Sequence, residues 1–264
     1  MLEISNTSLV ASTALEDGPG LFRMVRAFGW AAGTDEIRGL HQPRPMDISV
    51  AASLLCQAWA VSVSRPAIAS LVGARRMPDM AASNTVLAIN DEGRPAGASL
   101  LTPRFAAVAG DHGAAGDPRA EIVADEVDLF AWARARLFDG HLSLLVEALH
   151  DLAPIGRRLL WGNVAAATAG GFAVLSAPST TPSEADRLAK HARLLLDWPG
   201  SPTEGLAEVF PVAHDGGERL FVRRQTCCLR YRLPDAPPTC LSCRLMPERE
   251  RSRRIALRLQ AEAG

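Results

Sequence analysis

The chain has 264 residues, of which 48% are hydrophobic; this is ample for a packed core and excludes a disordered or fibrous protein. The net charge is −1 and the pI is about 6.6, which excludes the strongly basic surface of a general nucleic-acid-binding protein. The sequence has no internal repeat and no clear interdomain linker, so we predict a single domain over residues 1–264.

The N-terminus and the longest uncharged run bear on the compartment. Glu3 stands where a secretory signal would carry basic residues, and the apolar runs near it are short. The run at 159–178 is long enough for a membrane span, but Asn163 and a Gly-Gly pair within it favour a buried helix followed by a turn. We therefore expect a cytoplasmic protein. In that reducing compartment grouped cysteines are more often a metal or redox site than a disulfide framework.

The first part of the chain has both helical and strand-like patterns. An N-terminal helix is expected around 15–30. Between 45 and 78 the long apolar runs are interrupted by Pro66, which predicts two mostly buried helices. Two β-prone runs within 85–100, separated by the turn sequence NDEG, predict a hairpin.

Helical periodicity dominates the middle of the chain. Apolar residues recur at three- and four-residue steps from 118 to 150, and Asp139-Gly140 predicts a break between two helices. Further helices are expected at about 155–170 and, after the capping sequence TPSEAD, at about 183–197.

The periodicity changes towards the C-terminus. Two β-like runs flank the turn sequence HDGG and predict a second hairpin, whose strand continues through the alternation of Leu229, Tyr231 and Leu233 with arginines. A short basic helix starting at Pro247 closes the chain, and its weak apolar face favours a solvated tail. The predicted fold class is therefore α+β, mainly α-helical with small β-hairpins and a cysteine-rich C-terminal segment.

Four of the five cysteines lie in this last segment, namely Cys227, Cys228, Cys240 and Cys243. The spacer between the two pairs is rich in proline, so it is expected to be a loop, and the cluster-binding segment spans about 219–246. The fifth cysteine, Cys56, lies within an apolar helical run and is expected to be a small core residue.

Three roles compete for the two cysteine pairs. A loop rich in Pro, Asp and Arg offers little core for them to fill as apolar residues. A structural zinc site suits Cys240 and Cys243, but adjacent side chains on an extended strand point to opposite faces and reach one metal only if the strand bends. A [2Fe–2S] cluster spreads four thiolates over two irons and accepts ligands that leave the backbone in different directions. Residue chemistry favours the cluster and leaves zinc open.

The sequence RRQTCCLRYRLP followed by CLSC resembles the C-terminal signature of the FhuF-like ferric siderophore reductases, in which the two pairs hold a [2Fe–2S] cluster. The sequences DISVAASLLCQAWAVSVSRPAIASL and LLWGNVAAA are also similar to that family, so the resemblance covers about 45–245. It implies that all four cysteines of the two pairs are cluster ligands. This chain departs from the family in a spacer about one residue longer and in having Leu241, Ser242 and Arg244 around the CxxC, where Gly and Pro are common.

The resemblance implies an enzyme that gives one electron through its cluster to siderophore-bound Fe(III) and so releases Fe(II) for the cell. Hydroxamate siderophores are the expected substrates, because they hold Fe(III) with hard oxygen ligands and reduction weakens that hold. No nicotinamide or flavin fingerprint is visible, so the expected partner is an electron-donor protein or a small reductant. The alternative is a non-enzymatic metal-binding module, either a zinc-stabilised interaction protein or an iron–sulfur sensor.

Arginines near the cysteines are candidates for binding substrate. Arg224, Arg230 and Arg232 can attract an anionic siderophore or an acidic donor, although a solvated strand face explains them at least as well. The basic C-terminal helix is a candidate for transient contact with the inner membrane surface, but Glu248 and Glu250 interrupt its charge. We expect no nucleic-acid partner.

Overall fold

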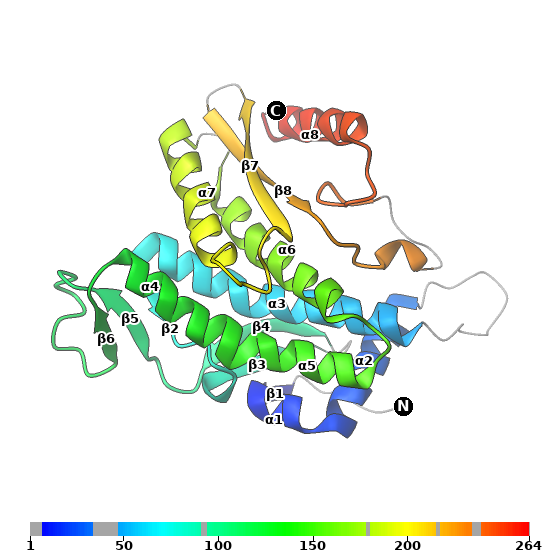
Figure 1. Ribbon diagram of the computed structural model, residues 1–264, viewed down its shortest axis with the longest axis horizontal. Coiled ribbons are helices and arrows are strands. Elements are labelled where there is room, and N and C mark those ends of the chain that lie inside the picture. Colours follow the sequence, from blue (N-terminus) through cyan, green and yellow to red (C-terminus); the bar gives the residue numbers. More distant parts are fainter. Residues whose placement is uncertain are drawn as a thin grey trace.

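The computed structural model describes residues 7–33, 47–90, 94–177, 180–214, 217–233 and 239–263. Helices predominate and small sheets flank them (Figure 1), which agrees with the predicted mixed α and β class. The helices are α1 (Ala11–Glu16), α2 (Gly18–Gly33), α3 (Ile48–Ala74), α4 (Glu126–Ala133), the π-helical stretch η2 (Arg134–Leu142), α5 (Ser143–Leu152), α6 (Arg157–Leu175), α7 (Pro182–Leu196) and α8 (Glu248–Ala263). The strands are β1 (Thr7–Val10), β2 (Arg76–Pro78), β3 (Thr85–Ile89), β4 (Pro95–Leu100), β5 (Phe105–Val108), β6 (Ala120–Val123), β7 (Ala207–His214) and β8 (Gly217–Arg224).

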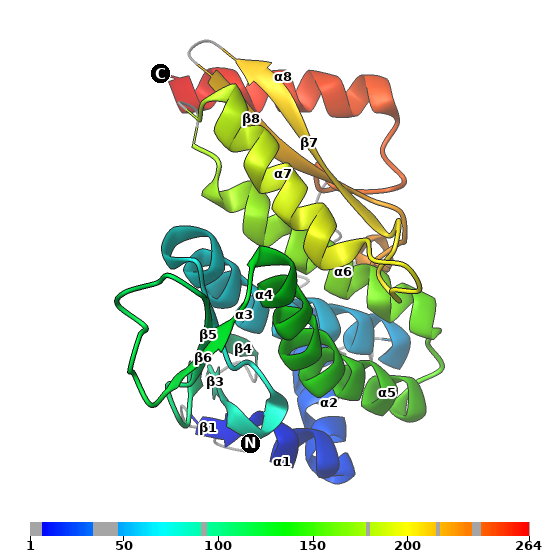
Figure 2. The same cartoon turned by 60° about the vertical axis from the view of Figure 1, so that its left-hand side comes forward.

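The long helices α3 and α6 lie side by side through the centre of the molecule (Figures 1 and 2). Small and hydroxyl-bearing residues let them approach closely. A Cβ at Gly171 of α6 would lie 2.6 Å from the Cδ1 atom of Ile68 on α3. The buried hydroxyl groups of Ser64 and Thr168 lie 3.2 Å apart across the same interface. This pair of helices forms the frame on which the rest of the chain packs.

Helix α3 runs without interruption through Pro66, so the prediction of two helices is wrong. A proline inside a helix removes a backbone hydrogen bond at a cost of roughly 3 kcal/mol. Pro66 lies on the exposed side, whereas Val63 and Ala67 on either side of it are fully buried. Burial of the apolar residues along α3 therefore outweighs the local cost.

Helix α3 also holds the fifth cysteine. Cys56 is fully buried and its Sγ donates to the carbonyl of Leu160 on α6 at 3.6 Å, which confirms its prediction as a core residue. Burial raises the pKa of this thiol to about 12. Within the described residues, α3 is the one helix whose length and composition would suit a membrane span, and most of it lies inside the protein.

The two predicted hairpins are confirmed, and each is only part of the β structure. β3 pairs antiparallel with β4, and β1 adds to the other edge of β3. β7 pairs antiparallel with β8 along its whole length. A further sheet joins β2, β5 and β6, and its strand β6 replaces the start of the helix predicted from residue 118. The hairpin tips at 91–93 and 215–216 lie outside the described residues.

The predicted break at Asp139-Gly140 is wrong, because the chain stays helical from α4 through η2 to α5. In η2 the backbone N–H of Ser143 donates to the carbonyl of Phe138, five residues earlier. A π-helical turn contains an extra residue compared with an α-helical turn. That extra residue lets the apolar side chains before and after Gly140 face the same core.

His141 lies in η2 and is fully buried. Its Nδ1 is 2.7 Å from the carbonyl oxygen of Met80, and its Nε2 accepts from the indole Nε1–H of Trp59 at 2.9 Å. The neutral ring with its hydrogen on Nδ1 satisfies both contacts, whereas a protonated ring would direct an N–H at the indole N–H. Burial lowers the pKa of His141 from 6.5 to about 4.

We expect the protein to lose stability as the pH falls from 6.5 to about 4. In this window the unfolded chain binds a proton on His141 that the folded chain does not bind. The contribution of neutral His141 to the free energy of unfolding is therefore fully present above the window and lost below it. The shift corresponds to about 3 kcal/mol in the free energy of unfolding. Urea denaturation across this pH range measures it. His141→Gln is the control, because an amide supplies a donor and an acceptor without titrating; an equally steep loss in this variant would contradict the assignment.

Helix α8 packs on the β7–β8 hairpin (Figures 1 and 2), so the prediction of a solvated tail is wrong. Ile255 and Leu259 of α8 are buried against Phe221 of β8. Arg251, on the same helix, is 2% exposed. The apolar face of α8 is narrow, but the hairpin supplies an aromatic surface that matches it.

Candidate metal centre at the cysteine pairs

The two cysteine pairs follow β8 in the chain, and a backbone hydrogen bond joins the end of β8 to the turn that carries the second pair. We call Cys227 and Cys228 the CC pair, and Cys240 and Cys243 the CxxC pair. The N–H of Arg224, the last residue of β8, donates to the carbonyl of Ser242 at 3.1 Å, which places the CxxC turn beside the strand that leads into the CC pair. The spacer residues 234–238 lie outside the described residues.

The four thiols differ in exposure. Cys228 is buried, Cys227 and Cys243 are half-buried and Cys240 is exposed; all four are free thiols. Burial raises the pKa of the Cys243 thiol. Repulsion from the negative charge of the other three cysteines, when they are thiolates, raises this pKa further. Among the described residues, no three Cys, His, Asp or Glu side chains come close enough to hold a metal ion as they stand. Ligation by the two pairs therefore stays a prediction.

The backbone bends sharply after the CC pair. Leu229 has a φ of 62°, in the left-handed region that residues other than glycine seldom adopt. Its N–H donates to the Sγ atom of Cys227 at 3.4 Å, a contact of the kind that supports a metal-bound thiolate. A short 3-10 turn follows at Arg230–Arg232, so the predicted continuation of the strand through Leu233 is wrong. The CC pair is thus not on an extended strand, and the argument from strand geometry against a zinc site does not apply.

A buried polar network ties the CC pair to the central helices. Ser53 of α3 donates through Oγ to the carbonyl of Cys228 at 2.9 Å. Asn163 of α6 donates through Nδ2 to the carbonyl and the hydroxyl of Ser53 at 2.8 and 2.9 Å. Arg224 donates to the Oδ1 of Asn163 and, at 2.9 Å, to the carbonyl of Thr226. The core helices therefore fix the backbone on which the CC pair stands.

The sequence Trp-Gly-Asn in the N-terminal half of α6 makes this contact possible. A Cβ at Gly162 would collide with Thr226, so glycine is what lets the chain before the CC pair lie directly on the helix. Trp161 packs against Phe138, with ring centroids 6.5 Å apart. Asn163 is fully buried. Trp161 and Asn163 therefore anchor a buried helix, and Asn163 also links that helix to the CC pair.

The three arginines predicted to bind substrate lie in different environments. Arg224 is 1% exposed, and its side chain is engaged in the polar network; the interpretation of it as a surface residue for substrate is therefore corrected. Its position at the end of β8 turns it towards α6 rather than towards water. Arg232 forms an ion pair with Asp47 at 3.4 Å, with both side chains half exposed. Arg230 is exposed, so Arg230 and Arg232 remain surface cations near the CC pair.

Arginine side chains of helix α8 hold the CxxC turn by donating hydrogen bonds to the backbone carbonyl groups of the turn. Arg251 donates to the carbonyls of Leu241, of Cys243 at 2.9 Å and of Met246 at 3.2 Å. Arg254 donates to the carbonyl of Thr239 at 2.8 Å. These roles are not visible in the sequence, because a basic helix is typical of a solvent-exposed face unless the loop that it contacts is known. The spacing of three residues between Arg251 and Arg254 is the one signal that they share a face.

Replacing Arg251 by glutamine is expected to loosen the CxxC turn. The shorter amide cannot reach three carbonyl groups, and the turn loses its link to α8. We expect the amides of Cys243 and Met246, which are bonded within the turn, to exchange with solvent at least about tenfold faster in hydrogen-exchange measurements, corresponding to about 1.4 kcal/mol. Arg249→Gln is the matched control, because Arg249 is exposed on the same helix. Equal exchange rates in the two variants would show that Arg251 does not hold the turn.

The family described as ferric iron reductase FhuF-like transporter matches residues 53–211, which is more than half of the chain. The chain belongs to this FhuF-like family. The matched region begins at Ser53 and includes Asn163, so it contains both helix residues that support the CC pair. It ends before the four cysteines. Family membership thus rests on residues 53–211, which include the central helices, and is independent of the cysteine pairs.

Among solved structures, the aerobactin synthetase from a hypervirulent pathotype of Klebsiella pneumoniae is similar to this FhuF-like chain, with a TM-score of 0.48 and 14% sequence identity. The likeness covers 74% of this chain and 32% of the synthetase, so the chain spans about a third of that enzyme's length. No curated protein matches the chain.

Proposed function

We propose that this protein is a cytoplasmic reductase of ferric siderophores and that its two cysteine pairs hold a [2Fe–2S] cluster. Membership of the FhuF-like ferric iron reductase family is the observation that carries the proposal. Four free thiols near the end of β8 support it, because cysteine thiolates are the usual ligands of such a cluster. When bound, the cluster supplies one-electron chemistry, which matches the reduction of siderophore-bound Fe(III) to Fe(II).

The protein's own residues would hold the cluster near the surface and tune it. The Leu229 N–H at the Cys227 sulfur supports the negative charge of the thiolates. The Ser242 hydroxyl lies 3.4 Å from the Cys240 sulfur, where it can form a hydrogen bond to that ligand. Cys240 is exposed, so a bulky ferric complex can approach this edge. Arg230 is exposed beside the CC pair and adds positive charge, which favours an anionic substrate or an acidic electron donor, whereas the charge of Arg232 is partly balanced by Asp47.

A hydroxamate siderophore as the substrate, and a protein or small reductant as the electron donor, belong to the same proposal. The arginines of α8 give little support to contact with a membrane surface. Arg253 and Arg254 pair with Glu250, and Arg258 pairs with Glu262. Paired charges on a helix attract anionic lipids less than a basic face does.

Visible absorption and anaerobic mixing test the proposal together. Protein purified without oxygen is expected to be coloured, to contain iron and acid-labile sulfide, and, once reduced, to release Fe(II) from ferric hydroxamates in a trapping assay. Colourless protein that contains zinc and no sulfide would overturn the proposal in favour of a zinc-stabilised interaction protein. Coloured protein whose reduced form leaves every ferric siderophore of a panel unchanged would indicate an iron–sulfur sensor.

A further inference from the structure

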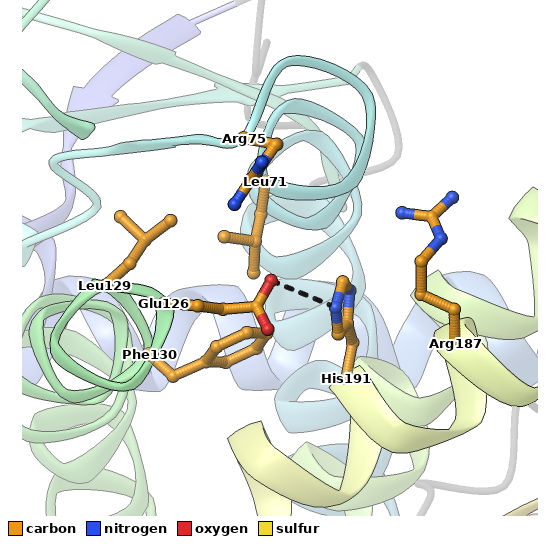
Figure 3. Close-up of a pocket in the computed structure, with 7 residues that line it drawn as sticks. All are labelled: Leu71, Arg75, Glu126, Leu129, Phe130, Arg187 and His191. Atoms are coloured by element: carbon orange, nitrogen blue, oxygen red, sulfur yellow. Dashed lines mark ion pairs between the residues drawn. The ribbon is translucent and has the colours of Figure 1, made fainter. Parts of the chain in front are cut away.

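A pocket lies at the C-terminal end of α3 (Figure 3). It has a volume of about 260 Å³ and forms where α3 meets the first turn of α4 and the middle of α7. Ser53, which contacts the CC pair, precedes the pocket residue Leu71 by five turns of α3, or about 27 Å along the helix axis. One small ligand cannot reach both places, so the pocket is a separate site.

The pocket has an apolar floor and a positively charged rim. Leu71, Leu129 and Phe130 line it and are almost completely buried. Arg75 and Arg187 line it from the end of α3 and from α7, and both are exposed. Neither guanidinium forms an ion pair within the part of the chain that the structure describes. Arg187 lies in the field of Glu184 without contacting it, so a carboxylate that enters the pocket would meet two guanidinium groups whose hydrogen-bond donors are not held by an ion pair.

Between the floor and the rim, Glu126 and His191 face each other (Figure 3), with Oε1 and Nε2 3.4 Å apart. The His191 side chain is nine-tenths buried, and its Nδ1 has no hydrogen-bond partner among the described residues. Burial lowers the pKa of His191, so its ring is neutral near neutral pH and its Nε2–H donates to the carboxylate. The Glu126 side chain is 39% exposed and retains acceptor capacity for a donor on a ligand.

We propose that this pocket binds a small monocarboxylate with an apolar body and a hydrogen-bond donor on its α-carbon, that is, an apolar α-amino or α-hydroxy acid. The carboxylate would lie between Arg75 and Arg187, the donor at Glu126, and the apolar body against Leu71 and Phe130. The negative charge of Glu126 disfavours a polyanion in the same place. The volume lies below the range of pockets for drug-sized ligands, which limits the body to a few carbon atoms.

Isothermal titration calorimetry with the full chain tests the site. L-Leucine and leucic acid, its α-hydroxy counterpart, are expected to bind saturably. Isocaproate lacks the donor and isoamylamine lacks the carboxylate, so each is expected to bind about tenfold more weakly or worse. Arg187→Gln is expected to lower the affinity for L-leucine about tenfold. The matched control is Arg193→Gln, an exposed position of α7 outside the pocket, and it is expected to change nothing.

Glu126→Gln distinguishes the amino acid from the hydroxy acid. Loss of the carboxylate charge is expected to lower the affinity for L-leucine, which carries an ammonium group, more than the affinity for leucic acid. Absence of saturable binding by both acids would overturn the proposal, as would unchanged affinity in Arg187→Gln. Tight binding of inorganic phosphate would overturn the ligand class in favour of simple anions. Binding is expected to persist in Cys240→Ser, so the result does not depend on the proposed reductase function.

Discussion

If the two cysteine pairs hold the proposed [2Fe–2S] cluster, replacing Cys240 by serine is expected to abolish both the visible absorption of the purified protein and the proposed reduction of ferric siderophores. A serine oxygen is a much poorer ligand for the irons of a cluster than a cysteine thiolate. Cys240 is exposed, and the hydrogen bond of its side chain in the described part of the chain is with Ser242, so the substitution is expected to leave the fold intact. Absorption spectra, iron and sulfide content and a thermal melt of the same preparation measure the effect.

The matched control is Cys56→Ser. Cys56 is fully buried in α3, and a serine hydroxyl there can donate to the same carbonyl of Leu160. Colour and reduction are expected to survive, with a loss of stability of about 1 kcal/mol from burying a more polar group. The opposite pattern, with colour retained in Cys240→Ser and lost in Cys56→Ser, would overturn the assignment of the ligands.

Replacing Asn163 by leucine is expected to destabilise the protein by about 3 kcal/mol or more. Leucine is similar in size but leaves the buried guanidinium of Arg224 without the acceptor that Asn163 supplies. It also removes both donations to Ser53, whose hydroxyl holds the carbonyl of Cys228. Chemical denaturation of the metal-free protein measures the loss without reference to any cluster.

Ser53→Ala gives the graded comparison. It deletes one hydroxyl group, with its bond to Cys228 and the bond that it accepts from Asn163, while Asn163 keeps its bond to the Ser53 carbonyl; the expected cost is about 1 kcal/mol. The buried bond between Arg224 and Asn163 stays in place. If the Asn163 variant proved no less stable than the Ser53 variant, the buried arginine would not depend on the asparagine. In coloured protein both variants are also expected to lose iron faster than the unaltered chain, since the CC pair stands on this network.

Local patterns in the sequence predict much of the fold because they record short-range physics. The capping sequence before α7 is confirmed as a capping box between Thr181 and Glu184. Both hairpins are confirmed, because alternating apolar residues and glycine- or asparagine-containing turns act over a few residues. The errors lie where burial outweighs local preference. Pro66 remains within a helix and Gly140 within a π-helical stretch, since the residues around them belong to one core.

The sequence by itself determined which chemistry is available, namely two cysteine pairs in a C-terminal segment, a core cysteine apart from them and an α+β frame. Those conclusions depend on residue type and spacing alone. Only the tertiary structure decided which arginines are structural. Arg224 and Arg251 look like surface cations in the sequence, yet folding buries both and directs them at carbonyl groups of the chain. The partners of a buried charge come from distant parts of the chain, such as Asn163 for Arg224, and no local pattern encodes that meeting.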